Sequence, residues 1–279
     1  LVNLSAETAG RLKKRFTYYV GVPDLSENSA LNGTHRDFEE NIRSGEIDGI
    51  LIGAVLGSHH LDWLRGQGIP AVAFLNDQFA PQPGMVTLDW LDFIEQAVEL
   101  LASQGCLRIG VLHPKPFSSA DPRLEHFKTV LKKKKLLFKR EWIWDAVPAS
   151  FNQFHISFEE CGYWAIKKPY QPAIPKRSTK TQRWVRMNTL PDGLVITDDM
   201  MARGAVKAAR EMGMDIGDTV RIVTHANKGS PALKDEKRLI RLLEFDPAEI
   251  IHRMFDMLDD LMDGRVDAET YIRIKARLV

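Results

Sequence analysis

The 279-residue sequence has few cysteines and no marked excess of either charge. Its two cysteines, Cys106 and Cys161, are far apart and belong to no CxxC or Cys/His cluster, which argues against a disulfide scaffold or a structural zinc site. The 38 Lys and Arg residues nearly balance the 37 Asp and Glu residues, whereas a chain that grips DNA directly normally has a basic excess. These features predict a protein of a reducing compartment that does not itself contact nucleic acid.

Long apolar runs and local catalytic motifs are also missing. No window approaches the roughly 18 apolar residues that span a bilayer, and the first residues lack the apolar middle region of a signal peptide. The sequence has no G-x-S-x-G elbow, Walker A loop, H-E-x-x-H or G-x-G-x-x-G fingerprint. We therefore expect a cytoplasmic protein with no membrane contact, no metal, no cofactor and no enzymatic activity, although a triad assembled in space would leave no local motif.

The residues that are present predict two α/β lobes. An apolar fraction of 44% over this length can bury a large core. Short β-branched runs alternate with amphipathic stretches, which is typical of βα units around a mostly parallel sheet. The expected strands are 17–22, 48–55, 69–76, 107–113, 192–199 and 219–225. The expected helices are 34–46, 58–68, 91–105, 123–136, 201–213 and 246–264, with glycine stops at Gly68, Gly105, Gly213 and Gly264. Residues 167–192, which are rich in proline and basic residues, are expected to form a long surface connection.

The most informative segment is 192–213, in which a buried strand leads into two consecutive acids and a helix with small residues on one face. Asp198 or Asp199 is expected to accept hydrogen bonds from the free N–H groups at the start of that helix, where the helix dipole favours a carboxylate. A capping role alone would explain both acids. A role in ligand binding at the end of the strand is the alternative.

This segment, Asp198-Asp199-Met200-Met201-Ala202-Arg203-Gly204 followed by Gly213-Met214-Asp215-Ile216 and a strand, resembles the effector domain of LacI/GalR regulators. Further segments occur in the family's order: Asp48-Gly49-Ile50, Gly68-Ile69-Pro70-Ala71-Val72, Val86-Thr87-Leu88-Asp89, Gly105-Cys106-Leu107-Arg108-Ile109-Gly110 and Leu242-Leu243-Glu244-Phe245-Asp246-Pro247. The resemblance runs from about residue 45 to the end. The first forty or so residues fit it poorly.

The resemblance implies a type I periplasmic-binding-protein-like fold, with two Rossmann-like lobes and an effector in the cleft between them. Three crossings of the chain are expected near 104–107, 230–239 and 265–270. They give an N-terminal lobe of 1–105 plus 236–267 and a C-terminal lobe of 106–235 plus 268–279. A DNA-binding headpiece would precede residue 1 and is absent from this sequence.

The function that the resemblance implies is effector sensing and dimerisation in a bacterial transcription regulator. The effector is expected to be a small molecule, a sugar or a sugar derivative, and the partner a second copy of the chain. Effector binding would change the angle between the lobes, and operator DNA would be contacted only through the headpiece. One alternative is a solute-binding protein of an ABC transport system. Another is an α/β enzyme that works at the same strand ends.

The resemblance also implies a set of effector-binding residues. Arg123 matches the arginine of the family motif R-x-x-G-[F/Y], although His126 replaces its glycine, and a surface salt bridge is the alternative role. Asp198 stands where an asparagine commonly faces the ligand, and Asp199 would hold the turn. Because Ala226 stands where an effector-binding aspartate is usual, His225, Asn227 or Thr224 is expected to replace it.

Trp90, which follows Asp89 at a strand end, is the tryptophan best placed to stack on a sugar, and core packing is the alternative. Both residues are therefore further candidates for the effector site. Core packing is expected for Trp63, Trp142, Trp144 and Trp164. Solvated positions are expected for the pair His59-His60 and for the basic run Lys132 to Lys135.

Overall fold

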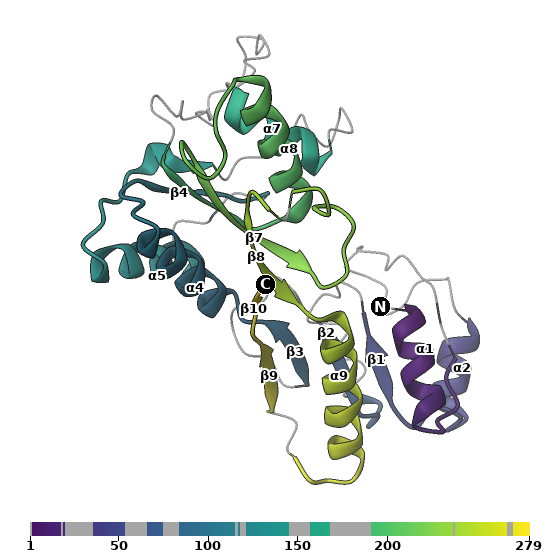
Figure 1. The fold of residues 1–279 in the computed structure, drawn as a ribbon. Helices are drawn as coiled ribbons and strands as arrows, with labels where there is room; N and C mark the ends of the chain where they lie inside the picture. The colour runs from purple at the N-terminus through teal and green to yellow at the C-terminus, as the bar shows by residue number, and fades with distance from the viewer. Residues whose placement is uncertain are drawn as a thin grey trace, which may run out of the picture. The chain divides into compact units, whose positions relative to one another are not determined.

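The computed structural model describes residues 2–17, 19, 36–53, 66–74, 84–114, 117, 121–144, 157–167, 191–236, 238–266 and 270–279. Internal contacts divide the chain into two α/β units, each made of two segments (Figure 1). Unit 1 contains Leu1–Leu88 and Asp246–Ile274, and unit 2 contains Asp89–Phe245 and Lys275–Val279. The predicted fold class, α/β with mostly parallel sheets, is confirmed.

Unit 1 is built on a four-stranded parallel sheet. Its strands are β1 (Ile50–Ile52), β2 (Ala71–Phe74), β3 (Met85–Leu88) and β9 (Tyr271–Ile274), in the order β1-β2-β3-β9. Its described helices are α1 (Val2–Arg11), α2 (Arg36–Arg43) and α9 (Pro247–Met262). Ile42 of α2 is buried together with Ile52, Ala73 and Met85 of the strands. Burial of these apolar side chains holds α2 against the sheet.

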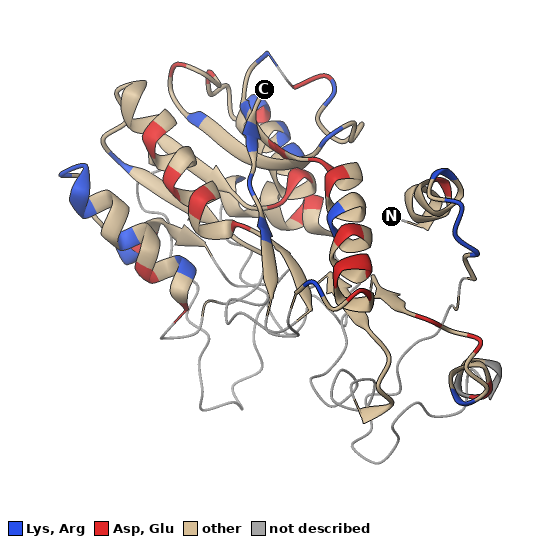
Figure 2. Ribbon diagram, turned by 90° about the horizontal axis from the view of Figure 1, so that it is seen from below, with Lys and Arg blue, Asp and Glu red and all other residues tan. Residues whose placement is uncertain are grey.

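Helix α9 packs on all four strands of this sheet. Asp246 caps it by accepting a hydrogen bond from the backbone N–H of Ala248, and Pro247 occupies the first turn, where its missing N–H costs nothing. The buried face carries Ile250, Ile251, Met254, Phe255, Met257 and Leu258. The other face is acidic (Figure 2), and its Asp259 accepts a hydrogen bond of 2.7 Å from Lys14, just after α1. An apolar face toward the sheet and a charged face toward water explain why this segment is helical.

Unit 2 is built on a six-stranded sheet with the order β10-β8-β7-β6-β4-β5. The strands are β4 (Ile109–Leu112), β5 (Ile143–Trp144), β6 (Gly193–Ile196), β7 (Arg221–Asn227), β8 (Arg241–Phe245) and β10 (Arg277–Leu278). All neighbouring pairs are parallel except β10 and β8. The helices are α4 (Trp90–Ser103), α5 (Pro122–Lys133), α7 (Phe158–Lys167) and α8 (Asp199–Glu211), with a short 3-10 turn η1 (Arg140–Trp142) before β5.

Helices cover both faces of this sheet (Figure 1). Helices α4 and α5 pack together on one face, and α7 and α8 pack together on the other. The pair α7 and α8 is in very close contact, because a Cβ on Gly162 would collide with the carbonyl of Met201 and one on Gly204 with the carbonyl of Glu159. Coverage on both faces explains why β4 and β6 are continuous apolar runs rather than alternating ones.

Most predicted elements are confirmed. The expected strands at 48–55, 69–76, 107–113, 192–199 and 219–225 contain β1, β2, β4, β6 and β7, and the expected helices other than 58–68 correspond to α2, α4, α5, α8 and α9. The four predicted glycine stops all have positive φ, between +66° and +87°. Most of 17–22, 58–68 and 167–192 lies outside the described residues, as do Trp63 and His59-His60.

The division by contacts differs from the predicted lobes at all three crossings, which follow Leu88, Phe245 and Ile274. The first crossing lies earlier because α4 packs its apolar face on β6 and β7 of unit 2. The second and third lie later because β8 pairs with β7 in unit 2 and β9 pairs with β3 in unit 1.

The structure confirms the expected burial of some tryptophans but not of all, and it confirms the expected exposure of the lysine run. Trp142 and Trp144 are buried, as predicted. Trp164 is 37% exposed, so its predicted core position is wrong: it lies on the outer side of α7, edge-on to Tyr163. The basic run at the end of α5 is exposed, as predicted.

Candidate functional site

The candidate site lies at the carboxyl ends of the parallel strands in unit 2. From β4 the chain enters α5 on one face and returns at β5, while from β6 it enters α8 on the other face and returns at β7. The strand order therefore reverses between β4 and β6. In open α/β sheets, ligands bind beside the carboxyl ends of strands at such a switch point.

His113 and Thr197 join the two strands at this point. They directly follow β4 and β6, and the His113 Nδ1 and the Thr197 Oγ1 are 2.6 Å apart. The imidazole also stacks on Phe117, with parallel rings 4.6 Å apart. Because both polar side chains are buried, this hydrogen bond fixes the orientation of the imidazole at the edge of the sheet.

Arg123, the predicted effector-binding arginine, lies in the first turn of α5 and is buried. Its Nε donates to Asp121 Oδ1 at 3.0 Å and its Nη2 to Oδ2 at 2.7 Å, while its guanidinium lies 5.3 Å from the Phe117 ring centre. Burial alone raises the pKa of Asp121, but the hydrogen bonds and the charge of Arg123 hold that pKa below its ordinary value. The arrangement excludes the alternative of an exposed surface salt bridge, since both side chains are 8% exposed.

Asp198 and Asp199 begin α8, as predicted. Asp198 caps the helix by accepting a hydrogen bond of 2.9 Å from the N–H of Met201, and burial together with the charge of Asp199 raises its pKa above the ordinary value. Asp199 accepts a hydrogen bond of 2.9 Å from Ser230, which follows β7. The first acid therefore has the capping role that its position predicted, and a ligand role for either acid stays a prediction.

His225 lies in β7 beside two aromatic rings. Its ring centre is 5.4 Å from those of Trp90 and Phe245. Burial lowers the pKa of His225 to about 4, and the charge of Asp199 opposes this only in part, so the imidazole is neutral at neutral pH. Within the described residues, neither ring nitrogen of His225 has a hydrogen-bond partner. A neutral imidazole can donate one hydrogen bond and accept another.

The remaining predicted residues are Trp90 and Asp89 at the start of α4 and Asn227 at the end of β7. Trp90 is 6% exposed and also packs edge-on against Phe93, so it has the core position that was the alternative to sugar stacking. Asp89 caps α4. Asn227, at the end of β7, is exposed, and its predicted role stays a prediction.

Side-chain contacts place several of the candidate residues in two groups. His113, Phe117, Asp121, Arg123 and Thr197 form one group, and Trp90 and His225 belong to the other. Sequence reasoning missed His113, Thr197 and Asp121. The sequence nevertheless carried a signal for Asp121, since an aspartate followed by proline is typical of a helix start.

The described residues contain no group of three or more His, Cys, Asp and Glu side chains arranged to hold a metal ion. None of the described helices combines the length and the apolar character needed to cross a membrane.

Comparison with known proteins gives one family and many structures of similar fold. The sequence model of a family described as "Periplasmic binding protein-like domain" matches residues 98–279. No curated protein matches the sequence. A solved regulatory protein of the LacI family from Chloroflexus aggregans is 19% identical, with a TM-score of 0.71 over 99% of this chain and 88% of that one.

Two other similar structures hold small molecules. The transcriptional regulator CelR in complex with cellobiose is 14% identical, with a TM-score of 0.67 over 100% of this chain and 76% of that chain. The Lac repressor bound to ONPG in its repressed state is 16% identical, with a TM-score of 0.66 over 100% of this chain and 75% of that chain. At these identities the likeness shows the fold, and it confirms the predicted periplasmic-binding-protein-like architecture.

Proposed function

Because the chain belongs to the periplasmic binding protein-like domain family, we propose that it is the effector-binding domain of a LacI-type transcription regulator. The observation that carries this proposal is the match of its fold, over 99% or more of its length, to a LacI-family regulator, to CelR and to the Lac repressor. The domain binds a small molecule and does not convert it. A headpiece N-terminal to the domain contacts operator DNA in the cytoplasm, and two copies of the chain form the working dimer.

The ligand that this site suits best is a sugar or a close derivative. CelR was solved with cellobiose, which supports this ligand class. Hydroxyl groups both donate and accept hydrogen bonds, and they therefore match the carboxylate acceptors of Asp198 at the start of α8. The ligand binds at the carboxyl edge of the six-stranded sheet, beside the switch point between β4 and β6.

A thermal-shift screen of the purified chain tests the proposal. The panel contains cellobiose, ribose and other neutral sugars, sugar phosphates, sugar acids and nucleobases. A ligand at a hundredfold excess over its dissociation constant stabilises the fold by about 2.7 kcal/mol, which is a measurable rise in Tm. If no class of compound raises the Tm, the effector-binding function is contradicted.

Two variants and one control test whether Arg123 and Asp198 bind the ligand. Arg123→Lys keeps the charge but loses the planar fork, and Asp198→Ser keeps a helix cap but loses the carboxylate. Both are expected to reduce the ligand-induced rise in Tm, whereas Arg203→Ala, an exposed arginine of α8, should not. If the ligand raises the Tm equally in the parent and in all three variants, the effector-binding function is supported but the assignment of Arg123 and Asp198 to the site is contradicted.

A solute-binding protein of a transport system is the second candidate, because the description of the matched family fits that function as well. The gene sequence upstream of residue 1 separates the two. A helix-turn-helix pattern supports the regulator, and an apolar signal segment supports the transport protein.

A further inference from the structure

Two acidic side chains at the candidate site have no cationic partner within the described residues. Asp198 accepts a hydrogen bond from the backbone N–H of Met201, and Asp199 accepts one from the hydroxyl of Ser230. Both donors are uncharged, and neither carboxylate forms an ion pair with a described Lys, Arg or His side chain. Because both acids follow β6 at the switch point, two adjacent negative charges lie at the edge of the sheet where a ligand is expected.

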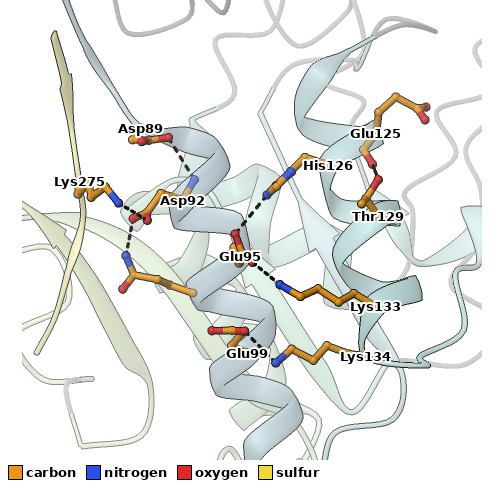
Figure 3. A network of polar contacts seen from close by, with 11 residues as sticks. Asp89, Asp92, Glu95, Glu99, Glu125, His126, Thr129, Lys133, Lys134 and Lys275 are labelled. Atoms are coloured by element: carbon orange, nitrogen blue, oxygen red, sulfur yellow. Dashed lines mark hydrogen bonds and ion pairs between the residues drawn. The ribbon is translucent and has the colours of Figure 1, made fainter.

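Acids elsewhere in unit 2 are arranged differently (Figure 3). Three acids of α4 are each paired with one lysine: Asp92 with Lys275 at 3.0 Å, Glu95 with Lys133 at 3.1 Å and Glu99 with Lys134 at 2.8 Å. At least one partner in each pair is exposed, so water also screens these charges. Asp198 and Asp199 are half-buried and have no such lysine. Their charges are therefore compensated less than those of the acids on α4.

The raised pKa of Asp198 reflects this lack of compensation. Burial raises that pKa, and so does the charge of Asp199, while the backbone N–H groups of Met201 and Met200 lower it only in part. The dipole of α8 favours a carboxylate at the start of the helix, but it amounts to only about half an elementary charge. A positive charge bound beside Asp198 would therefore favour its ionised form, and a bound negative charge would disfavour it.

The described basic residues that follow the same strands do not offset these charges. Arg123, after β4, is already paired with Asp121 through two hydrogen bonds. Arg203, on α8 after β6, is exposed, and its Nε lies 3.7 Å from a carboxylate oxygen of Glu159. Lys228, after β7, is also exposed, so water and salt screen its charge. The half-buried part of this edge therefore remains negative.

A buried imidazole lies within range of the same negative charge. His225 is 9% exposed, and within the described residues neither of its ring nitrogens has a hydrogen-bond partner. Burial lowers its pKa to about 4, and the charge of Asp199 opposes this effect, which shows that the carboxylate acts on the ring. Because the imidazole is neutral at neutral pH, the ends of the neighbouring strands β6 and β7 share an environment in which no protonated His225 offsets the acids.

We propose that this site selects its effector by charge: it binds a sugar derivative with a positively charged amino group most tightly, a neutral sugar less tightly, and an anionic derivative weakly. The proposal rests on the proposed effector-binding function and adds the charge of the ligand to it. An ammonium group donates charge-assisted hydrogen bonds to carboxylates such as those of Asp198 and Asp199. A phosphate or carboxylate group would instead place a like charge beside them, which is strongly unfavourable in a binding site.

Matched sets of compounds test the selection by charge. Each set contains an amino sugar, the parent neutral sugar, the sugar acid and the sugar phosphate, and the sets are built on glucose, galactose and mannose. Dissociation constants are measured by calorimetry at low salt, where charges are screened least. Within a set that binds, the amino sugar is expected to bind at least about tenfold more tightly than the acid or the phosphate.

Three variants test whether the two acids cause the selection. Asp198→Asn and Asp199→Asn each remove one negative charge, and asparagine still caps a helix. Each variant is expected to reduce the preference for the amino sugar over the acid by about tenfold. Asp92→Asn is the control, because this carboxylate lies on α4 and is paired with Lys275, and it should leave the preference unchanged. A ratio of two dissociation constants measured in one protein is insensitive to a general loss of stability.

The outcomes distinguish failure of the charge selection from failure of the proposed function. A parent protein that prefers the anionic compounds, or a preference that Asp198→Asn and Asp199→Asn leave unchanged, overturns the selection by charge while effector binding still stands. Binding of the neutral sugar alone keeps the discrimination against anions and overturns the preference for an ammonium group. If no compound of any charge binds to the parent, the effector-binding function is contradicted, and the selection by charge is contradicted with it.

Discussion

Arg123 and Asp121 form a buried, two-point ion pair in which Nε and Nη2 of the guanidinium donate to both carboxylate oxygens, at 3.0 and 2.7 Å. The Nε and Nη2 edge of the guanidinium is thus already engaged within the chain. The pair fixes the guanidinium plane beside Phe117 at the switch point. A ligand that contacts Arg123 therefore contacts a guanidinium whose orientation is fixed and whose charge is largely neutralised by Asp121.

Removal of the carboxylate from this pair is expected to lower the free energy of unfolding strongly. Asp121→Ala leaves a buried guanidinium without its counter-charge, and such losses destabilise by about 3–5 kcal/mol. Urea unfolding measures the difference. Glu125→Ala, in the same helical turn, removes an exposed pair with Lys128 and should cost at most about 1 kcal/mol. A double-mutant cycle with Arg123→Met completes the test, since a coupling near zero would contradict a direct interaction.

His225 gives the fold a specific sensitivity to acid. Its pKa is lowered from 6.5 to about 4 by burial. Because the folded-state pKa lies below the unfolded one, the unfolded chain takes up the proton first as the pH falls. Stability should therefore decline between about pH 6.5 and pH 4, by roughly 3 kcal/mol for this group.

Urea unfolding across this pH range compares the parent with His225→Phe, which cannot titrate. As the pH falls from 6.5 to 4, the free energy of unfolding of the parent should drop relative to that of His225→Phe. Below about pH 4 the difference between the two proteins should stay constant. His252→Phe, at an exposed position on α9, should follow the parent curve. A flat difference for His225→Phe would rule out the buried, neutral histidine.

Short apolar runs were sufficient to predict β6 and β7, and an amphipathic stretch was sufficient to predict α8, because the burial of regular elements leaves a regular trace in the sequence. The Arg123 partner was not predictable in this way. A salt bridge two residues away depends on a side-chain direction that no pattern encodes. Trp164 was misassigned because size and apolarity favour burial on average, whereas its place on the outer side of α7 depends on which face meets α8.

The close contact of α7 and α8 predicts that Gly204 tolerates no side chain. A Cβ there would collide with the backbone carbonyl of Glu159, which cannot move like a side chain. Gly204→Ala is expected to lower the free energy of unfolding by about 1–3 kcal/mol through overpacking. Gly10→Ala in α1 is the matched control, because nothing lies within 4 Å of its Cβ position and helix propensity should make it neutral or stabilising. The two variants are compared by thermal unfolding, and equal effects would contradict the close contact.

The bond between His113 and Thr197 predicts a graded response to substitution. Thr197→Val keeps the shape but removes the hydroxyl, which leaves a buried imidazole nitrogen without this partner and should cost about 1–3 kcal/mol. Thr197→Ser keeps the hydroxyl and should cost less. Denaturant unfolding of the three proteins decides, and an equal loss in both variants would show that the methyl group, not the hydrogen bond, matters.

The position of β6 between β4 and β7 has a consequence for how the chain folds. The pairs β6–β7 and β7–β8 join neighbouring parts of the sequence, whereas pairing of β4 with β6 brings together residues 84 positions apart. Closing so long a loop costs chain entropy, and native contacts offset this cost only after the loop has closed. The segment from β6 to β8 can therefore assemble early around α8, and the switch point that carries His113 and Thr197 forms only when the central pair closes. We therefore expect this edge of the sheet to become ordered after the segment from β6 to β8.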